Sequence, residues 1–190
     1  MTEKKDSNMQ SVFVALFAAL IAAGGFIAIP TPGAVPIVLQ NMLAITTGIL
    51  LGGAQGGGAV GLFLMAGALG LPVFSGGRGG MSHLMGPTGG FLFGYFIAAL
   101  IAGFFVGKPH INKKSPISRI IIASVFAYLI VYALGIAQFM SVMGSSFAQA
   151  IAACLIPFIP GLAIKLFLTI ILSWKLRPLI AQYIFSENHD

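Results

Sequence analysis

The sequence has few charged residues, and its acidic residues lie only near the two ends. Of its 190 residues, 7% are charged, and four are acidic: Glu3, Asp6, Glu187 and Asp190. A soluble domain usually carries about 25% charged residues. Because 58% of this chain is hydrophobic, it cannot cover a water-exposed surface. The composition therefore excludes a soluble protein and predicts an integral membrane protein.

Other absences limit the chemistry. No G-x-x-x-x-G-K-[ST] motif is present, so we do not expect the chain to hydrolyse nucleotides. No carboxylate lies inside the apolar segments, which disfavours a standard ion-coupled carrier. The single cysteine, Cys154, indicates neither a disulfide nor a metal site. We expect no metal, no cofactor, no catalytic residue and no nucleic-acid partner. An enzyme built on His83 with Ser75 or Ser82 is a weak alternative.

Long apolar runs predict an all-α membrane protein with six transmembrane helices, because a helix needs about 20 residues to cross the bilayer. We treat residues 1–190 as a single membrane domain with polar tails at 1–10 and 186–190. A glycine-rich connection at 52–58 is expected to lead into the third span, and residues 141–157 to form a link with a short helix of its own. The predicted spans cover residues 11–29, 36–51, a third ending near Leu71, 86–106, 117–140 and 158–176.

The basic residues predict the orientation. In a six-span arrangement, Lys4, Lys5, the segment 108–119 and the tail with Lys175 and Arg177 fall on one side. The positive-inside rule makes that side cytoplasmic. We therefore expect a multi-pass protein of the cytoplasmic membrane with both termini inside. The connection between the third and fourth helices would then be a structured extracellular loop.

That loop, residues 71–95, combines a cation, a histidine and many glycines. Arg78 lies in Gly-Gly-Arg-Gly-Gly, His83 follows, and Gly-Pro-Thr-Gly-Gly at 86–90 opens the next apolar run. Guanidinium groups, free backbone N–H groups and helix N-termini all favour anions. The loop is therefore predicted to be an anion receptor, and its glycines would let it open and close over a ligand.

Further polar residues are expected at the same depth. Counting about 1.5 Å per helical residue places Gln40, Asn41, Gln138 and Lys165 in the outer leaflet with Arg78. Nothing between Ser7 and Ser186 can neutralise Lys165. A buried cation without a counter-ion is costly, so we hypothesise that a small organic anion supplies the charge. The alternatives are that Lys165 extends to water or loses its proton.

The first span carries two rows of alanines at four-residue spacing: Ala15, Ala19 and Ala23, and beside them Ala18 and Ala22. Small residues at this spacing let another helix approach closely in lipid. The rows indicate either an ordinary contact inside the protein or a docking face for a partner subunit. If the chain transports a solute, a partner has to supply the energy.

Several motifs resemble the BioY family. They are Val-Pro-Ile-Val-Leu-Gln-Asn at 35–41, Gly-Leu-Pro-Val-Phe-Ser-Gly-Gly at 70–77, Gly-Pro-Thr-Gly-Gly-Phe-Leu-Phe-Gly-Tyr at 86–95, and Phe-Ile-Pro-Gly at 158–161 followed by Lys165. The resemblance implies a six-helix S component of a bacterial energy-coupling factor (ECF) transporter that binds biotin on its outer face. It also implies a transmembrane coupling subunit and two cytoplasmic ATPases as partners, with the alanine face of the first helix taking part. A stand-alone permease for an organic anion is the alternative.

Biotin suits these residues, because its carboxylate needs a cation, its ureido group needs amide partners and its apolar part needs an apolar pocket. Arg78 and Lys165 would supply positive charge, and Gln40 and Asn41 would bind the polar head. The family usually reads Pro-Gly-Asp before the lysine, whereas Leu162 follows Gly161 here. The full set of predicted substrate-binding residues is Gln40, Asn41, Phe74, Arg78, His83, Gly89, Gly90, Phe91, Tyr95, Gln138, Phe147, Phe158 and Lys165.

Overall fold

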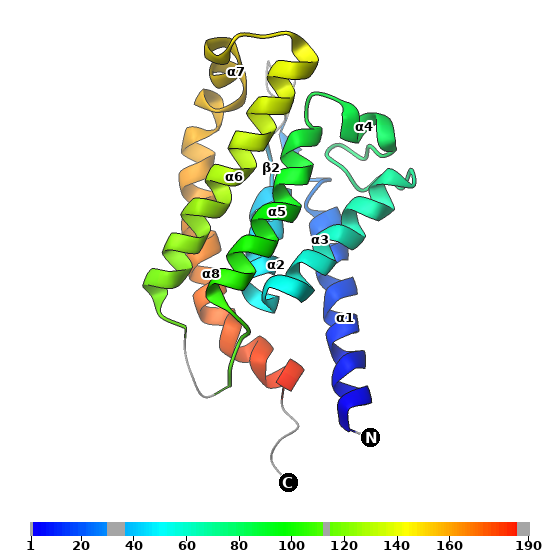
Figure 1. The fold of residues 1–190 in the computed structure, drawn as a ribbon, viewed down its shortest axis with the longest axis vertical. Coiled ribbons are helices and arrows are strands. Elements are labelled where there is room, and N and C mark those ends of the chain that lie inside the picture. Colours follow the sequence, from blue (N-terminus) through cyan, green and yellow to red (C-terminus); the bar gives the residue numbers. More distant parts are fainter. Residues whose placement is uncertain (1, 30–36, 112–114, 186–190) are drawn as a thin grey trace.

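The computed structural model describes residues 2–29, 37–111 and 115–185, and over these residues the protein is a bundle of helices (Figure 1). Long apolar stretches form helices in a membrane because a helix satisfies every backbone hydrogen bond within the segment. The elements, in chain order, are α1 (Thr2–Ala23), β1 (Ala28–Ile29), β2 (Ile37–Val38), α2 (Gln40–Leu51), α3 (Gly53–Ala68), α4 (Met81–Met85), α5 (Gly89–Val106), α6 (Ile117–Met143), α7 (Phe147–Cys154), the 3-10 turn η1 (Ile156–Phe158) and α8 (Ile159–Phe185).

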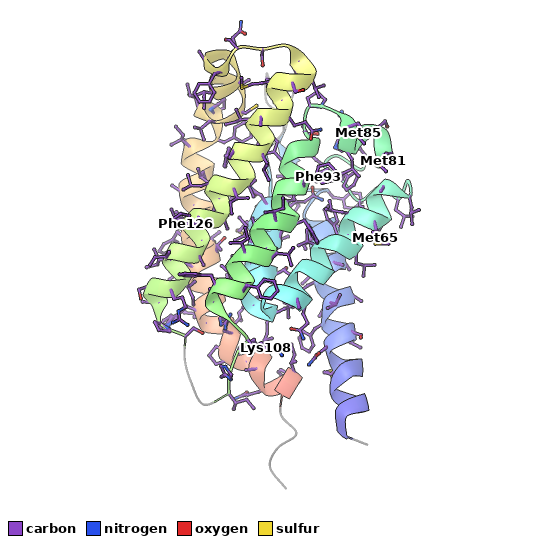
Figure 2. All side chains as sticks on the ribbon, in the orientation of Figure 1. Met65, Met81, Met85, Phe93, Lys108 and Phe126 are labelled. Atoms are coloured by element: carbon purple, nitrogen blue, oxygen red, sulfur yellow. The ribbon has the colours of Figure 1, made fainter. Side chains whose placement is uncertain are left out.

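The main core surrounds α5, which packs against α2, α3 and α6. Three stretches are long and apolar enough to cross a membrane: Gly89–Val106, Ile117–Met143 and Phe147–Ile184. Met9–Ala23 and Gln40–Leu51 are shorter apolar helices. Large side chains such as Phe93 and Phe126 point outward from α5 and α6 (Figure 2), and they are 42% and 59% exposed. This exposure fits a surface covered by lipid chains.

The two ends of the bundle differ. The start of α1 and the end of α8 lie at one end, which we call the termini end (Figure 1). The opposite end, which we call the loop end, carries α4, α7 and the β1–β2 pair. This pair is antiparallel, with Ala28 opposite Val38 and Ile29 opposite Ile37. Residues 30–36, which join the two strands in sequence, lie outside the described residues.

The boundaries of α5 and α6 agree closely with the predicted spans, and the short helix expected within 141–157 is α7. A capping box starts α7, in which the Gln149 N–H donates to Ser146 Oγ at 3.4 Å and the Ser146 N–H donates to Gln149 Oε1 at 2.9 Å. The predicted first span is shifted, because α1 ends at Ala23, where Gly24 and Gly25 follow.

The glycine-rich connection predicted at 52–58 is wrong, because α3 already begins at Gly53. Only Gly52, with a φ of 85°, makes the turn between α2 and α3. The following glycines serve close packing instead. A Cβ on Gly56 would lie 2.5 Å from the Gly48 Cα, and one on Gly57 would lie 2.2 Å from the Leu100 side chain.

Gly48 gives a test of this packing. A Cβ at Gly48 would lie 2.4 Å from the Ala99 carbonyl oxygen, and the neighbouring atoms are backbone. Gly48→Ala is therefore expected to push α2 away from α5 and to lower the melting temperature of the purified protein by several degrees. Gly58→Ala is the control, because its nearest neighbour is 3.9 Å away. Equal melting temperatures for the two variants would contradict the assigned contact.

The last helix is longer than the predicted sixth span. It continues past Leu176 to Phe185, so the expectation that Arg177 follows the last helix is wrong. Beyond Pro178, buried Ile180 and Ile184 join a small second core with Leu50, Leu51 and Ala59. Phe13, Val14 and Phe17 of α1 pack against it. The end of α8 is thus folded against α1, α2 and α3 at the termini end.

Candidate functional site

Lys165 is buried near the loop end of the bundle. It lies six residues after the start of α8, or about 9 Å along the helix axis. The residue is 7% exposed, and its ammonium group donates to the Val38 carbonyl oxygen at 2.6 Å and to Asn41 Oδ1 at 3.1 Å. Lys165 therefore joins α8 to the first residues of α2.

The surroundings of Lys165 do not balance its charge. Both acceptors are neutral, and no carboxylate is present among the side chains that the structure describes. The ammonium also lies at the N-terminus of α2, where the helix dipole contributes about half a positive charge. The N-terminus of α5 lies at the same end of the bundle (Figure 1). A ligand with a negative group would be favoured beside Lys165.

Gln40 connects α2 to the long loop. It is fully buried, and its Nε2 donates to the Val73 carbonyl oxygen at 2.7 Å. Its Oε1 has no hydrogen-bond partner among the described residues. By contrast, Asn41 Oδ1 already accepts from Lys165 and from the Met42 N–H. The side-chain oxygen of Gln40 is thus an unpaired buried acceptor, while the oxygen of Asn41 orients the lysine.

Arg78 lies on an exposed turn of the same loop. Its carbonyl accepts from the Phe74 N–H at 2.8 Å, and its own N–H donates to the Phe74 carbonyl at 3.3 Å. Gly76 and Gly77 have φ values of 69° and 71°, which side-chain-bearing residues rarely adopt. No described hydrogen bond or ion pair joins Arg78 to Lys165. The two cations are connected indirectly. Asn41, which bonds Lys165, is adjacent to Gln40, and Gln40 bonds the Val73 carbonyl. Val73 is in turn adjacent to Phe74, whose backbone bonds that of Arg78.

His83 packs beneath the same turn. Its ring stacks on Phe74 with centroids 5.4 Å apart, and its Nε2 lies 3.4 Å from the Thr88 hydroxyl. Burial, together with the positive charge of Arg78, lowers the pKa of His83 below its usual value of 6.5. The neutral ring is therefore the form that suits the folded loop.

A pH dependence follows from this. The unfolded chain binds the His83 proton more readily than the folded chain, so folded stability is complete above about pH 6.5 and decreases as the pH falls below it. We expect the melting temperature to fall between pH 7 and pH 5 by more in the natural protein than in His83→Phe. Parallel pH profiles for the two proteins would rule out this role of His83.

The loop is held in position by Gln138, Gly89 and Gly90. Gln138 Nε2 donates to the Leu84 carbonyl at 2.9 Å and to the Gly86 carbonyl at 2.8 Å. A Cβ on Gly89 would lie 1.7 Å from the Leu84 carbonyl oxygen, and one on Gly90 would lie 2.3 Å from that of Leu134. These residues hold the start of α5 tightly against α4 and α6.

The predicted aromatic residues differ in how deeply they are buried. Phe74 is fully buried and packs edge-on against Phe63 with centroids 5.5 Å apart. Phe91, which meets Tyr132 edge-on at 5.9 Å, Tyr95 and Phe158 are also buried. Phe147, at the first residue of α7, is 64% exposed. Phe74 and Phe91 belong to the main core, and Phe147 is absent from it.

The two alanine rows of α1 separate into an inner and an outer row. Ala18 is 7% exposed and Ala22 packs against the main core, so this row contacts the rest of the protein. Ala15, Ala19 and Ala23 are exposed. They form an uncovered strip of small residues beside exposed Leu16 and Leu20.

Sequence reasoning missed a polar stripe along α8. Lys165, Thr169, Ser173 and Arg177 recur every fourth residue, and all are buried, with exposed fractions of 7%, 0%, 0% and 3%. The guanidinium of Arg177 donates through NH1 to the Ile49 carbonyl and through NH2 to the Gly107 carbonyl at 3.0 Å. These carbonyls lie at the C-terminal ends of α2 and α5, whose dipoles are negative. The four-residue spacing was a visible signal for this face.

Known proteins resemble this chain along nearly its whole length. The sequence model of the BioY family matches residues 1–182. A biotin transporter BioY from Rhodobacter capsulatus is 38% identical over 181 residues, which is 90% of this chain and 92% of that protein. The biotin transporter BioY of Thermotoga maritima is 33% identical over 90% of this chain and 96% of its own.

The fold also matches a solved structure. A crystal structure described as the S-component for biotin from an ECF-type ABC transporter superposes with a TM-score of 0.82. The two chains are 30% identical, and the match covers 93% of this chain and 94% of the other.

Proposed function

The chain belongs to the BioY family, and we propose that it is the biotin-binding S component of an ECF-type vitamin uptake transporter. It is a transport protein and not an enzyme. A stand-alone permease is not favoured, because the matching solved structure is described as an S-component. Biotin would be the transported ligand and not a cofactor.

The observation that carries the binding site is the buried Lys165. Its ammonium lies at a helix N-terminus with only neutral acceptors, Val38 O and Asn41 Oδ1. A ligand carboxylate would neutralise it through charge-assisted hydrogen bonds. The unpaired Oε1 of Gln40 would accept from a ureido N–H group of biotin. Because Leu162 stands where the family usually has an aspartate, Gln40 is our proposed substitute for that acceptor.

The remaining predicted residues would lie around Lys165 and Gln40. Arg78 and the glycines near it would form a cationic cover, which His83, Gln138, Gly89 and Gly90 hold in position. Tyr95, Phe91 and Phe158 would border the apolar part of the ligand, and Phe74 would support the cover from below. We leave Phe147 out of the proposed pocket because its side chain is 64% exposed.

We further propose that the loop end faces outward and that both termini are cytoplasmic. Exposed Lys108, Arg119 and Lys175 lie in the segments nearest the termini end, which the positive-inside rule places inside the cell. Six segments would span the cytoplasmic membrane: α1, α2, α3, α5, α6 and α8. Shorter α2 and α3 would cross together with the loops that extend them.

The outer alanine row is the proposed contact with a transmembrane coupling subunit, which would work with two cytoplasmic ATPases. Ala19→Leu would place a bulky group on this exposed strip and is expected to reduce co-purification of the coupling subunit while leaving biotin affinity unchanged. Ala133→Leu, at an exposed alanine of α6, is the control. Equal co-purification of both variants would place the contact on another face.

The test of the whole proposal uses the purified chain and liposomes. Biotin is expected to bind the chain tightly, and liposomes containing only this chain are expected to show no sustained uptake. Uptake should require the coupling subunit and the ATPases. Failure to bind biotin would refute the proposed ligand, and uptake by the chain alone would instead support a permease.

A further inference from the structure

Basic residues from three elements meet at the termini end. Lys108 follows Gly107, the C-cap of α5 (Figure 2), Arg119 lies in the first turn of α6, and Arg177 lies in α8. The Arg177 guanidinium donates to the Gly107 carbonyl at 3.0 Å, so it lies beside the backbone of Lys108. Arg119 is close enough to Arg177 for their positive charges to repel each other. We call Lys108, Arg119 and Arg177 the basic cluster.

The protein itself does not balance the charge of this cluster. No carboxylate is present among the side chains that the structure describes, and the whole chain carries 10 basic residues against 4 acidic ones. The C-terminal ends of α2 and α5, which Arg177 contacts, contribute roughly half a negative charge each. They offset about one of the three positive charges, so about two remain.

The start of α6 adds to the positive charge. A helix N-terminus carries roughly half a positive charge and is stabilised by acidic residues or by a capping side chain. The first turn of α6 has no acidic residue and no side-chain cap, and it carries Arg119 instead. A cation is unfavourable at this position. An anion bound beside Arg119 would be attracted by the side chain and by the helix end together.

The surroundings of Arg119 indicate that this anion belongs to a lipid. Arg119, Ile122 and Phe126 recur at helical positions i, i+3 and i+7, so they share one face of α6. All three are exposed, and Phe126 points away from the bundle (Figure 2). Trp174, the only tryptophan, is exposed on α8 and precedes Arg177 by less than one turn. Because tryptophan is enriched where a membrane meets water, the basic cluster lies at the depth of the lipid headgroups.

We propose that the basic cluster binds the phosphate of an anionic phospholipid whose acyl chain lies along Ile122 and Phe126. Arg119 would donate to the phosphate through its guanidinium, and Lys108 would add a second positive charge. Arg177 would attract the phosphate from inside the bundle while it keeps its bonds to the ends of α2 and α5. Basic pockets between transmembrane helices bind anionic headgroups in other membrane proteins. This proposal does not depend on the identity of the transported ligand.

The test measures the melting temperature of the purified protein in mixed micelles that contain either phosphatidylglycerol or phosphatidylcholine. A lipid that binds only the folded protein stabilises it, so phosphatidylglycerol is expected to raise the melting temperature by about 3 °C or more relative to phosphatidylcholine. Arg119→Gln is expected to lose at least half of this difference, and adding Lys108→Gln should remove the rest. Both side chains are exposed, so the variants should melt like the natural protein in phosphatidylcholine.

Lys175→Gln is the matched control, because Lys175 is exposed and lies about 200° around α8 from Arg177. It should keep the full difference between the two lipids. An equal loss in Lys175→Gln and Arg119→Gln would indicate unspecific attraction to any surface cation and would overturn the proposal. Equal melting temperatures of the natural protein in the two lipids would also overturn it.

Inorganic phosphate distinguishes a lipid from a free anion. Sodium phosphate added to the phosphatidylcholine micelles should leave the melting temperature of the natural protein unchanged, because it has no acyl chain to lie along α6. An increase as large as that with phosphatidylglycerol would mean that the cluster binds free phosphate and that no lipid is required, which would contradict the proposal.

Discussion

Lys165→Ala is expected to weaken biotin binding by tenfold or more in titrations of the purified protein. The substitution removes the buried ammonium for which no described side chain supplies a counter-charge. It also removes the donor that Asn41 Oδ1 and the Val38 carbonyl share. Tenfold corresponds to about 1.4 kcal/mol, which is a modest value for a charge-assisted hydrogen bond.

The matched control is Lys175→Ala, which removes an exposed lysine from the same helix and should leave affinity unchanged. A biotin analogue without its carboxylate sharpens the test, because it should bind the natural protein and Lys165→Ala with similar affinity. If Lys165→Ala keeps the natural affinity for biotin, Lys165 does not belong to the site.

Arg177→Met is expected to lower the melting temperature by about 5 °C or more. Its guanidinium joins α8 to the C-terminal ends of α2 and α5, and removing it leaves the Ile49 and Gly107 carbonyls without that donor. Hydrogen bonds to charged groups contribute roughly 1.5–3 kcal/mol each, although relief of guanidinium burial offsets part of the loss. The effect should therefore be on stability and not on the affinity of the folded protein for biotin.

Arg119→Met provides the comparison, because Arg119 is exposed and lies close enough to act electrostatically on Arg177. Its melting temperature should change little. A similar fall in both variants would mean that loss of local positive charge, and not loss of the carbonyl contacts, determines the effect.

Apolar composition and the length of the apolar runs predicted the helical class, and they predicted the bounds of α5 and α6 to within three residues. Glycine caused the main error, because the segment 52–58 reads as a tight connection although most of it is helical. The same residue type permits a turn and permits close helix packing, and only the neighbouring helix decides between them. At Gly48 and Gly56 that neighbour is another backbone segment.

The candidate site was also predicted only in part. The absence of acids predicted that Lys165 would lack a counter-ion, and its burial agrees with that prediction. Sequence alone could not assign Asn41 Oδ1 to Lys165, since the two residues are 124 positions apart. It also placed Gln138 among the substrate-binding residues, whereas in the structure its amide donates to two loop carbonyls. Such pairings depend on helix register, which local composition does not encode.

The four-residue repeat on α8 also fixes the rotation of that helix about its own axis. Each helical residue turns the chain by about 100°, so a single-residue insertion between Ile159 and Lys165 would swing all four polar side chains toward the hydrocarbon together. The cost of moving both cations there would oppose any such slip. The repeat that buries Lys165 and Arg177 therefore fixes the rotation at which α8 packs into the bundle. The polar contacts near the two ends of this helix cannot change independently of each other.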